Sequence, residues 1–367
     1  MMSHIMLSKL KIMETTKALI PMIKTINTNN IATMKGRVRY KTIDAVLESR
    51  QDIKAFMDGE ADMHLLFDLP SSIPAERVAR YKKLYAGIGN TSCYTIPLAN
   101  DNLLRIKMEY ANGMGNNHYS RCWIPYLFIA ETLGVIVPEE THLLEVSSGS
   151  AGISLSMAAN FLDYKLTLVI PDKLPKGRTA PMEYYGANLV KVPGYIGNCI
   201  KEMRRLLVRN TYFPCNHSEE NADLLVKIDK RIAIEYKAVY GTPDYCIIGL
   251  GNGTSTYAIF DYWTSFKKQM ELVTYHPDLT KPEVVFGLYT SNVNLRHIEP
   301  ALSMATERLY TSEMDIDMVR KLFCFDTEIS NLGESSLYAI FIALEKAKHV
   351  ASKTFFTIGY DKRDRYV

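Results

Sequence analysis

The fold is decided by one segment, residues 245–255, which reads YCIIGLGNGTS. Its first four residues form a short apolar run typical of a buried strand, and the glycines at 249, 251 and 253 predict a tight turn. A helical pattern begins near Thr256, so the order is strand, turn, helix. A turn of this kind presents unpaired backbone N–H groups at a helix start, where a phosphate can bind. It also fits a plain tight turn, and the spacing alone does not separate the two interpretations.

This turn differs from two well-known nucleotide-binding patterns. It lacks the lysine of the motif G-x-x-x-x-G-K-[ST], and its glycines alternate, in contrast with the dinucleotide fingerprint G-x-G-x-x-G. Thr254 and Ser255 add two hydroxyl donors to the backbone N–H groups. The candidate ligand is therefore a small phosphate compound rather than a nucleotide.

Two further segments repeat the order of strand, turn and helix. The run LLEV at 143–146 leads into SSGSAG at 147–152, and the run LTLVI at 166–170 is followed by a helix and a second strand at 189–192. Short β-type runs that alternate with amphipathic segments predict an α/β fold with parallel or mixed sheets and crossover helices. The serine-rich turn fits either carboxylate binding or an ordinary capped helix start.

The bulk properties exclude several classes of protein. With 367 residues, the chain is long enough for two lobes and an extension. Its net charge of +3 is spread over stretches of mixed sign, so we expect no nucleic-acid partner. No run approaches the roughly 18 apolar residues of a membrane-spanning helix, so we expect no membrane partner and a cytoplasmic location.

The six cysteines are scattered along the chain. They form no C-x-x-C pair and no Cys/His cluster with the spacing of a zinc site. We therefore expect free, mostly buried thiols and no metal site.

The first 80 residues differ in pattern from the rest. Ile43, Leu47, Ile53 and Met57 fall near one face at helical spacing. We expect a helical extension at 1–80 that covers the remainder, supports dimerisation or binds a protein partner.

Five motifs, taken in order, resemble those of cysteine synthase and cystathionine β-synthase, which are fold type II enzymes of pyridoxal phosphate (PLP). They are Ile88–Thr91, Lys107–Asn112, Ser147–Gly152, Gly186–Val190 and Gly249–Ser255. The resemblance covers roughly residues 88–366. It implies a two-lobed domain at 81–367 with the cofactor in the cleft between the lobes, a smaller lobe at about 112–220, and usually a homodimer.

The resemblance also implies roles for two of the turns. The cofactor phosphate would be cradled by Gly251, Asn252, Gly253, Thr254 and Ser255. The substrate carboxylate would be bound by Ser147, Ser148, Gly149 and Ala151.

The chain departs from the family at three positions that carry the chemistry. In the family a lysine holds the cofactor as an imine, but the matching passage at 112–121 reads NGMGNNHYSR. Alignment on Arg121 places Tyr119 at the lysine position, and a shift of one residue places His118 there. Neither side chain can form an imine.

The other two departures concern the cofactor ring. Ser150 replaces the asparagine that bonds the ring hydroxyl, and Lys362 stands where a serine usually contacts the pyridine nitrogen. An ammonium group only donates hydrogen bonds, so Lys362 cannot accept one from a protonated ring. Both residues remain candidates for the cofactor side of the cleft.

Three functional hypotheses follow. In the first, the cleft binds a small amino-acid-type ligand with a phosphate or carboxylate group, without ordinary PLP-dependent β-replacement. His118 and Tyr119 are then acid–base candidates, unless His118 is a surface residue on a turn and Tyr119 a plain cleft wall. In the second, the protein is a pseudoenzyme that senses a metabolite or binds a protein partner. In the third, a lyase or transferase uses PLP or a PLP adduct without a covalent link to lysine.

Overall fold

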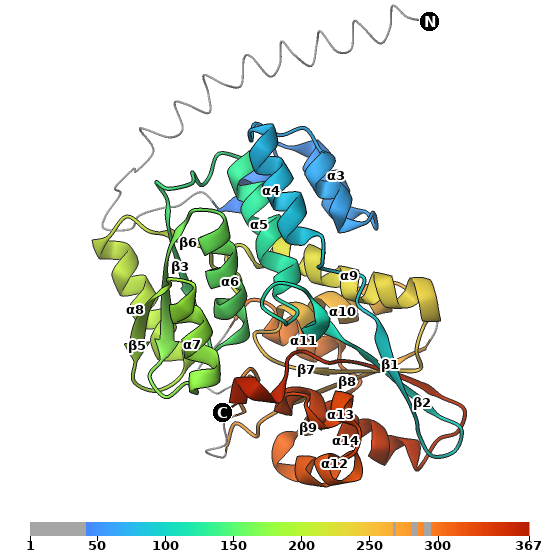
Figure 1. Ribbon diagram of the computed structural model, residues 1–367. Coiled ribbons are helices and arrows are strands. Elements are labelled where there is room, and N and C mark those ends of the chain that lie inside the picture. The colour runs from blue at the N-terminus through green and yellow to red at the C-terminus, as the bar shows by residue number, and fades with distance from the viewer. Residues whose placement is uncertain (1–41, 267–268, 281–284, 290–294, 367) are drawn as a thin grey trace, which may run out of the picture.

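A computed structural model of the chain describes residues 42–266, 269–280, 285–289 and 295–366. Within these ranges the chain forms a six-stranded and a four-stranded sheet with helices on their faces (Figure 1), which confirms the predicted α/β class. The expectation for residues 1–41 lies outside the described residues. In the described part, no helix is long and apolar enough to cross a membrane.

The larger sheet has the strand order β1-β2-β10-β7-β8-β9. Its strands are β1 (Cys93–Pro97), β2 (Leu103–Lys107), β10 (Thr354–Ile358), β7 (Tyr245–Gly249), β8 (Glu271–His276) and β9 (Glu307–Tyr310). β1 and β2 form an antiparallel hairpin, and every other neighbouring pair is parallel. The side chains of β7 alternate: Ile247 packs in one apolar cluster with α14 (Glu334–Ala347), whereas Cys246 and Ile248 pack in another with α9 (Ala222–Tyr240) and α10 (Thr254–Thr264). Helices therefore cover both faces of this sheet.

The smaller sheet is parallel throughout, with the strand order β5-β4-β3-β6. Its strands are β5 (Asn188–Val192), β4 (Lys165–Pro171), β3 (His142–Val146) and β6 (Phe213–Pro214). Leu144 and Val146 pack in one cluster with α8 (Ile196–Arg209), whereas Leu143 packs on the opposite side in a cluster with α5 (Ser120–Thr132), α6 (Ser150–Phe161) and α7 (Lys176–Tyr184). A parallel sheet covered on both faces explains why its strands read as continuous apolar runs.

The described part of the N-terminal extension is helical, as predicted. It consists of α2 (Ile43–Leu47), α3 (Gln51–Asp58), η1 (Met63–Asp68) and α4 (Ala75–Tyr85). These helices share one apolar cluster with α5 and lie beside α5 and α9 (Figure 1). Tyr81 also donates a hydrogen bond of 2.7 Å to Glu131 at the end of α5. The extension is therefore built into the same core as the smaller sheet.

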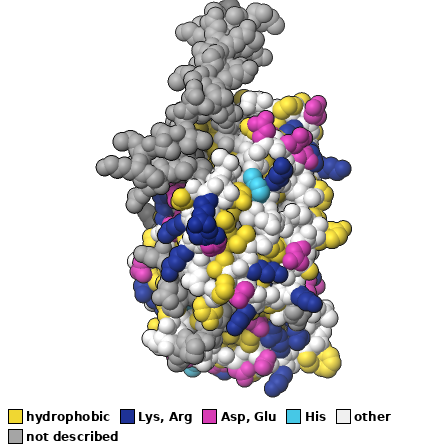
Figure 2. Space-filling view, turned by 90° about the vertical axis from the view of Figure 1, so that its left-hand side faces the viewer, with side chains coloured by type: hydrophobic (Ala, Val, Ile, Leu, Met, Phe, Trp, Pro, Cys, Tyr) yellow, Lys and Arg dark blue, Asp and Glu magenta, His cyan; other side chains and the backbone are white. Residues whose placement is uncertain are grey.

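The remaining elements are short. They are η2 (Glu109–Ala111), α11 (Ile298–Met304), η3 (Thr311–Glu313), α12 (Ile316–Leu322), α13 (Thr327–Ser330) and η4 (Arg363–Tyr366). On the face shown in Figure 2, basic and acidic side chains are scattered among apolar ones.

The topology brings two turns together. The turn after β3, residues 147–149, leads into α6, and the turn after β7, residues 250–253, leads into α10. Both follow the carboxyl ends of parallel strands, which is where open α/β sheets place their ligands.

Candidate ligand-binding site

A cavity of about 520 Å³ lies where the carboxyl ends of β3 and β7 meet. It brings together most of the residues predicted from the sequence. Those that line it are His118, Tyr119, Ser147, Ser148, Ser150, Ala151, Gly251, Asn252, Gly253 and Ser255. Gly149, Thr254 and Lys362 are outside its lining.

The glycine-rich turn presents free backbone donors to this cavity. Among the described residues, five backbone N–H groups here have no acceptor, those of Gly251, Asn252, Gly253, Ser255 and Thr256. The first regular helical hydrogen bond of α10 is donated by the next residue, Tyr257. Five such donors at the start of an 11-residue helix, where the helix dipole is positive, suit an anion. The arrangement fits a phosphate group.

Two glycines of this turn are required by close approach of the neighbouring chain. A Cβ atom on Gly251 would lie 2.7 Å from the carbonyl oxygen of Gly287. Gly253 has a φ of +88°, and a Cβ atom there would lie 2.6 Å from the carbonyl carbon of His297. A larger residue at either position would force the turn away from the segments that close the cavity.

The hydroxyl groups of the turn are directed elsewhere. Ser255 donates a hydrogen bond of 2.6 Å to Oδ2 of the buried Asp229. Thr254 has a buried hydroxyl with no partner among the described residues. The predicted hydroxyl donors therefore do not add to the cradle in this arrangement, which is made of backbone N–H groups.

The serine-rich turn combines a cap with a buried cation. The Ser147 hydroxyl accepts hydrogen bonds from the N–H groups of Gly149 (3.0 Å) and Gly152 (2.8 Å), so it caps the start of α6. The carbonyl oxygen of Ser148 accepts a bond of 2.7 Å from Nη1 of Arg178. A Cβ atom on Gly149 would lie 2.4 Å from that nitrogen, so the glycine makes room for the guanidinium.

The C-terminal segment contributes a residue that sequence reasoning missed. Asp361 lines the cavity, accepts a bond of 2.9 Å from the Ser150 hydroxyl, and accepts another of 3.1 Å from Tyr366. Burial raises the pKa of its carboxyl group. Lys362, the predicted candidate, is exposed instead, with Nζ 4.5 Å from the ring centre of Tyr110.

His118 and Tyr119 both lie at the start of α5 and face the cavity. Their ring centres are 4.0 Å apart, and the Tyr119 hydroxyl accepts a hydrogen bond of 3.1 Å from the side chain of Asn252. His118 is buried, so the alternative of a surface position is wrong. Burial lowers the pKa of His118 to about 4 and raises that of Tyr119 well above its usual range. At neutral pH both side chains are therefore uncharged, and the Tyr119 hydroxyl retains its proton.

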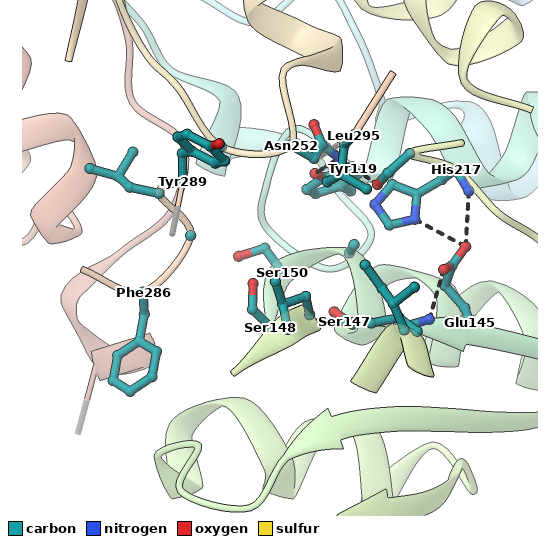
Figure 3. A pocket seen from close by; sticks show the side chains of 18 of the residues that line it. Tyr119, Glu145, Ser147, Ser148, Ser150, His217, Asn252, Phe286, Tyr289 and Leu295 are labelled. Atoms are coloured by element: carbon teal, nitrogen blue, oxygen red, sulfur yellow. Dashed lines mark hydrogen bonds and ion pairs between the residues drawn. The ribbon is translucent and has the colours of Figure 1, made fainter. Parts of the chain in front are cut away.

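A second histidine faces the cavity, and it was not singled out from the sequence. His217 follows β6, and its Nδ1 lies 3.0 Å from Oε2 of Glu145 at the end of β3, although the ring N–H does not point straight at that oxygen. Figure 3 shows this pair beside Tyr119, across the cavity from Phe286. The sequence offers one signal for this pair: Glu145 stands inside the apolar run LLEV, and a carboxylate buried in a strand needs a polar or charged partner.

The cavity contains one lysine among its described lining residues. This residue, Lys173, is exposed and follows the end of β4. In the same part of the chain, no group of three or more His, Cys, Asp or Glu side chains is placed to hold a metal ion.

The chain is similar to known proteins in sequence. The profile of a family described as "Pyridoxal-phosphate dependent enzyme" matches residues 84–298. Cysteine synthase B of Pseudomonas aeruginosa is 35% identical over 116 residues, which is 31% of this chain and only 38% of that protein. Cysteine synthase of Flavobacterium sp. is 25% identical over 272 residues, covering 69% of this chain and 88% of the relative.

Solved structures give the same fold. A hydrogen sulfide-producing enzyme from Fusobacterium nucleatum has a TM-score of 0.69 at 22% identity, covering 77% of this chain and 97% of the other. O-acetylserine dependent cystathionine beta-synthase from Helicobacter pylori has a TM-score of 0.68 at 20% identity, covering 77% and 96%. O-ureido-L-serine synthase has a TM-score of 0.66 at 19% identity, covering 77% and 92%. At these identities the likeness is one of fold alone.

Proposed function

The chain belongs to the family of pyridoxal-phosphate dependent enzymes, and on this basis we propose that its cavity binds a small amino-acid-type ligand that carries a phosphate or carboxylate group. We further propose that it does not carry out lysine-dependent β-replacement. The names of the relatives, cysteine synthase and cystathionine beta-synthase, are those of proteins that act on amino acids. The class of ligand is taken from them, and the specific reaction is left open.

One observation carries this proposal: the cradle of unpaired N–H groups at 251–253 and 255–256 is joined to Tyr119 through Asn252. The cradle supports an anionic ligand, because its donors have no acceptor among the described residues. Tyr119, linked to Asn252 of that cradle by a hydrogen bond, supports the loss of the covalent anchor, because a phenol cannot replace an amine in imine chemistry.

The cavity fits one part of PLP and not another. The N–H cradle suits its phosphate group. The start of α5, however, offers His118 and Tyr119, and Lys173 at the end of β4 is exposed. The residues present do not fit a covalently held cofactor, so no chemical step is assigned to one. The ligand's own phosphate or carboxylate group is the natural occupant of the cradle.

A substitution that restores an amine tests the position of Tyr119. We expect wild-type protein, incubated with PLP and then reduced with borohydride, to acquire no cofactor on a lysine of the cavity. Tyr119→Lys should acquire it at residue 119, because the new amine lies beside the phosphate cradle. Absorption spectra and peptide mass spectrometry measure the result, and Tyr289→Lys, on another wall of the cavity, is the matched control.

The outcomes separate the hypotheses. Reduction of PLP onto Lys173 of the wild type would overturn the loss of the anchor. A thermal-shift screen with phosphate esters and amino acids should give stabilisation by at least one compound, since a ligand present at 100 times its Kd adds about 2.7 kcal/mol. Stabilisation by none of them would favour a pseudoenzyme that acts through a protein partner.

A further inference from the structure

The imidazole of His217 is fixed in place on several sides. Its ring centre lies 5.5 Å from that of Tyr119 and 5.5 Å from that of the buried Trp123, both in edge-on contacts. On a third side, Oε2 of Glu145 lies 3.0 Å from its Nδ1. A side chain constrained in this way presents one orientation to the cavity.

Glu145 favours a proton on Nδ1 of the ring, because its Oε2 lies 3.0 Å from that nitrogen. Its Oε1 accepts a bond of 2.7 Å from the N–H group of Val146, and its Oε2 accepts one of 3.1 Å from the N–H group of His217. In the neutral form of the ring, the negative charge of this carboxylate beside Nδ1 favours the tautomer with the proton on Nδ1. Nε2 is then left with a free lone pair.

Nε2 opens into the cavity. His217 is only 6% exposed and lines the cavity. In the described chain Nε2 has no hydrogen-bond partner. Unlike Nδ1, it is not among the fully buried polar atoms without a partner. The exposure that His217 retains therefore includes this nitrogen, as an acceptor directed at the cavity.

The acceptor lies close to the phosphate cradle. The Asn252 side chain donates one hydrogen bond of 3.0 Å to Ser218, the residue after His217, and another to Tyr119. Asn252 belongs to the cradle, so these two bonds join the cradle directly to the segment that carries the imidazole. In Figure 3, Ser148 and Ser150 lie below Tyr119, between Phe286 and Glu145.

We propose that Nε2 of His217, oriented by Glu145, accepts a hydrogen bond from an ammonium or hydroxyl group of the ligand. The ligand class is then a phosphorylated amino acid or hydroxy acid, with its phosphate on the cradle and its donor group a few bonds away. The assignment rests on the proposed function, which it deepens. His217 is a binding residue, and Glu145 is a positioning residue.

Ligands with and without the donor test the assignment. O-phospho-L-serine has a phosphate, a carboxylate and an ammonium group, whereas 3-phosphooxypropionate lacks the ammonium group. We expect the wild type to bind O-phospho-L-serine about tenfold or more tighter by calorimetry, which is the range of one hydrogen bond to a charged group. His217→Leu should remove that preference, and inorganic phosphate should bind both proteins within about twofold.

Conservative variants extend the test. His217→Gln retains an acceptor and should keep part of the preference, and Glu145→Gln should reduce it without changing the binding of inorganic phosphate. His349→Leu, at an exposed histidine, is the matched control. Circular dichroism verifies that each variant is folded.

Each outcome has one meaning. Equal affinity of the wild type for the two ligands overturns the role of His217, whatever the variants do. A preference that survives in His217→Leu but disappears in Glu219→Gln moves the donor site to that cavity carboxylate. Failure of all three probes to bind the wild type counts against the proposed function itself.

Discussion

Asp229 lies next to the glycine-rich turn, and among the described residues its direct side-chain partners are a hydroxyl and a thiol. It is fully buried in α9 and accepts hydrogen bonds from the Ser255 hydroxyl (2.6 Å) and the Cys122 thiol (3.1 Å). Burial raises the pKa of its carboxyl group to about 6, against the lowering effect of the two hydrogen bonds. The turn that we propose as an anion site is therefore attached to a carboxyl group whose protonated form is favoured by burial.

The raised pKa makes stability depend on pH. Because the folded pKa lies above the unfolded value of 3.8, the stabilising contribution is complete below about pH 4 and is lost as the pH rises through about 6. We expect Asp229→Asn to increase the free energy of unfolding at pH 8 by roughly 2 kcal/mol and to have little effect at pH 4. Asparagine can still accept from Ser255, so the contact is retained. Urea unfolding across this pH range measures the difference.

The control for this substitution is Asp317→Asn, at a carboxyl group that is 76% exposed. It should change stability by less than about 0.5 kcal/mol at either pH. A decrease in stability at pH 8 in Asp229→Asn would mean that the hydrogen bonds accepted by the charged carboxylate stabilise the fold by more than the burial of that charge destabilises it.

At the level of elements, a buried network of charges joins β2, η2, α5 and α9. Arg121 of α5 lies 2.5 Å from Glu109 of η2 and 2.5 Å from Glu235 of α9, and Lys107 of β2 lies 2.7 Å from Glu235. The paired cations lower the pKa of Glu109 to about 2 in spite of burial. The four elements are thereby linked beneath the wall that carries His118 and Tyr119.

Removal of one charge should break this link. We expect Glu109→Gln to lower the free energy of unfolding by about 3 kcal/mol or more at pH 7, because Arg121 loses part of its compensation while it remains buried. The lowered pKa means that the wild type loses the same contribution as the pH falls from about 4.5 toward 2. Chemical unfolding at pH 7 and pH 3 checks both statements.

A surface pair provides the comparison. Glu48→Gln removes the partner of Lys54 in an exposed ion pair, and it should lower stability far less than Glu109→Gln because solvent screens the pair. Equal losses in the two variants would contradict the structural role of the buried network.

The elements that the sequence predicted are those with a local signal. The runs at 143–146, 166–170, 189–192 and 245–248 correspond to β3, β4, β5 and β7 with ends shifted by at most one residue, because glycines and prolines bound apolar stretches there. β2 gives a weaker signal, since its last residue, Lys107, is a charged side chain buried in the ion network. Local pattern cannot indicate that a distant glutamate compensates that charge.

The same distinction applies to the site. The glycines of the turn were found because close approach and positive φ leave a mark in the sequence itself. Glu145 and His217 are 72 residues apart, and Ser150 and Asp361 are 211 residues apart. Such pairs exist only through the fold, so the sequence predicted the glycine-rich and serine-rich turns of the cavity but not Glu145, His217 and Asp361.

At the level of the whole molecule, Arg178 connects the helices of the smaller sheet with the C-terminal segment. Its Nε donates to the carbonyl oxygen of Arg365 (2.9 Å), and its guanidinium carbon lies 4.7 Å from the ring centre of Tyr366 and 5.4 Å from that of Phe286. Together with the bond to Ser148, these contacts hold η4 against α7 at one end of the cavity.

Lysine cannot reproduce this set of contacts, because it lacks the planar guanidinium group, which donates hydrogen bonds in two directions and stacks on aromatic rings. We therefore expect Arg178→Lys to increase amide exchange about tenfold or more in 176–184 and 363–366, since a local opening made easier by 1.4 kcal/mol exchanges ten times faster. Exchange in the N-terminal helices should stay unchanged. Arg205→Lys, at an arginine of α8 paired with Glu202 of the same helix, is the matched control. Faster exchange spread evenly over the molecule would mean that Arg178 contributes to global stability only, and that it does not fasten these two segments to each other.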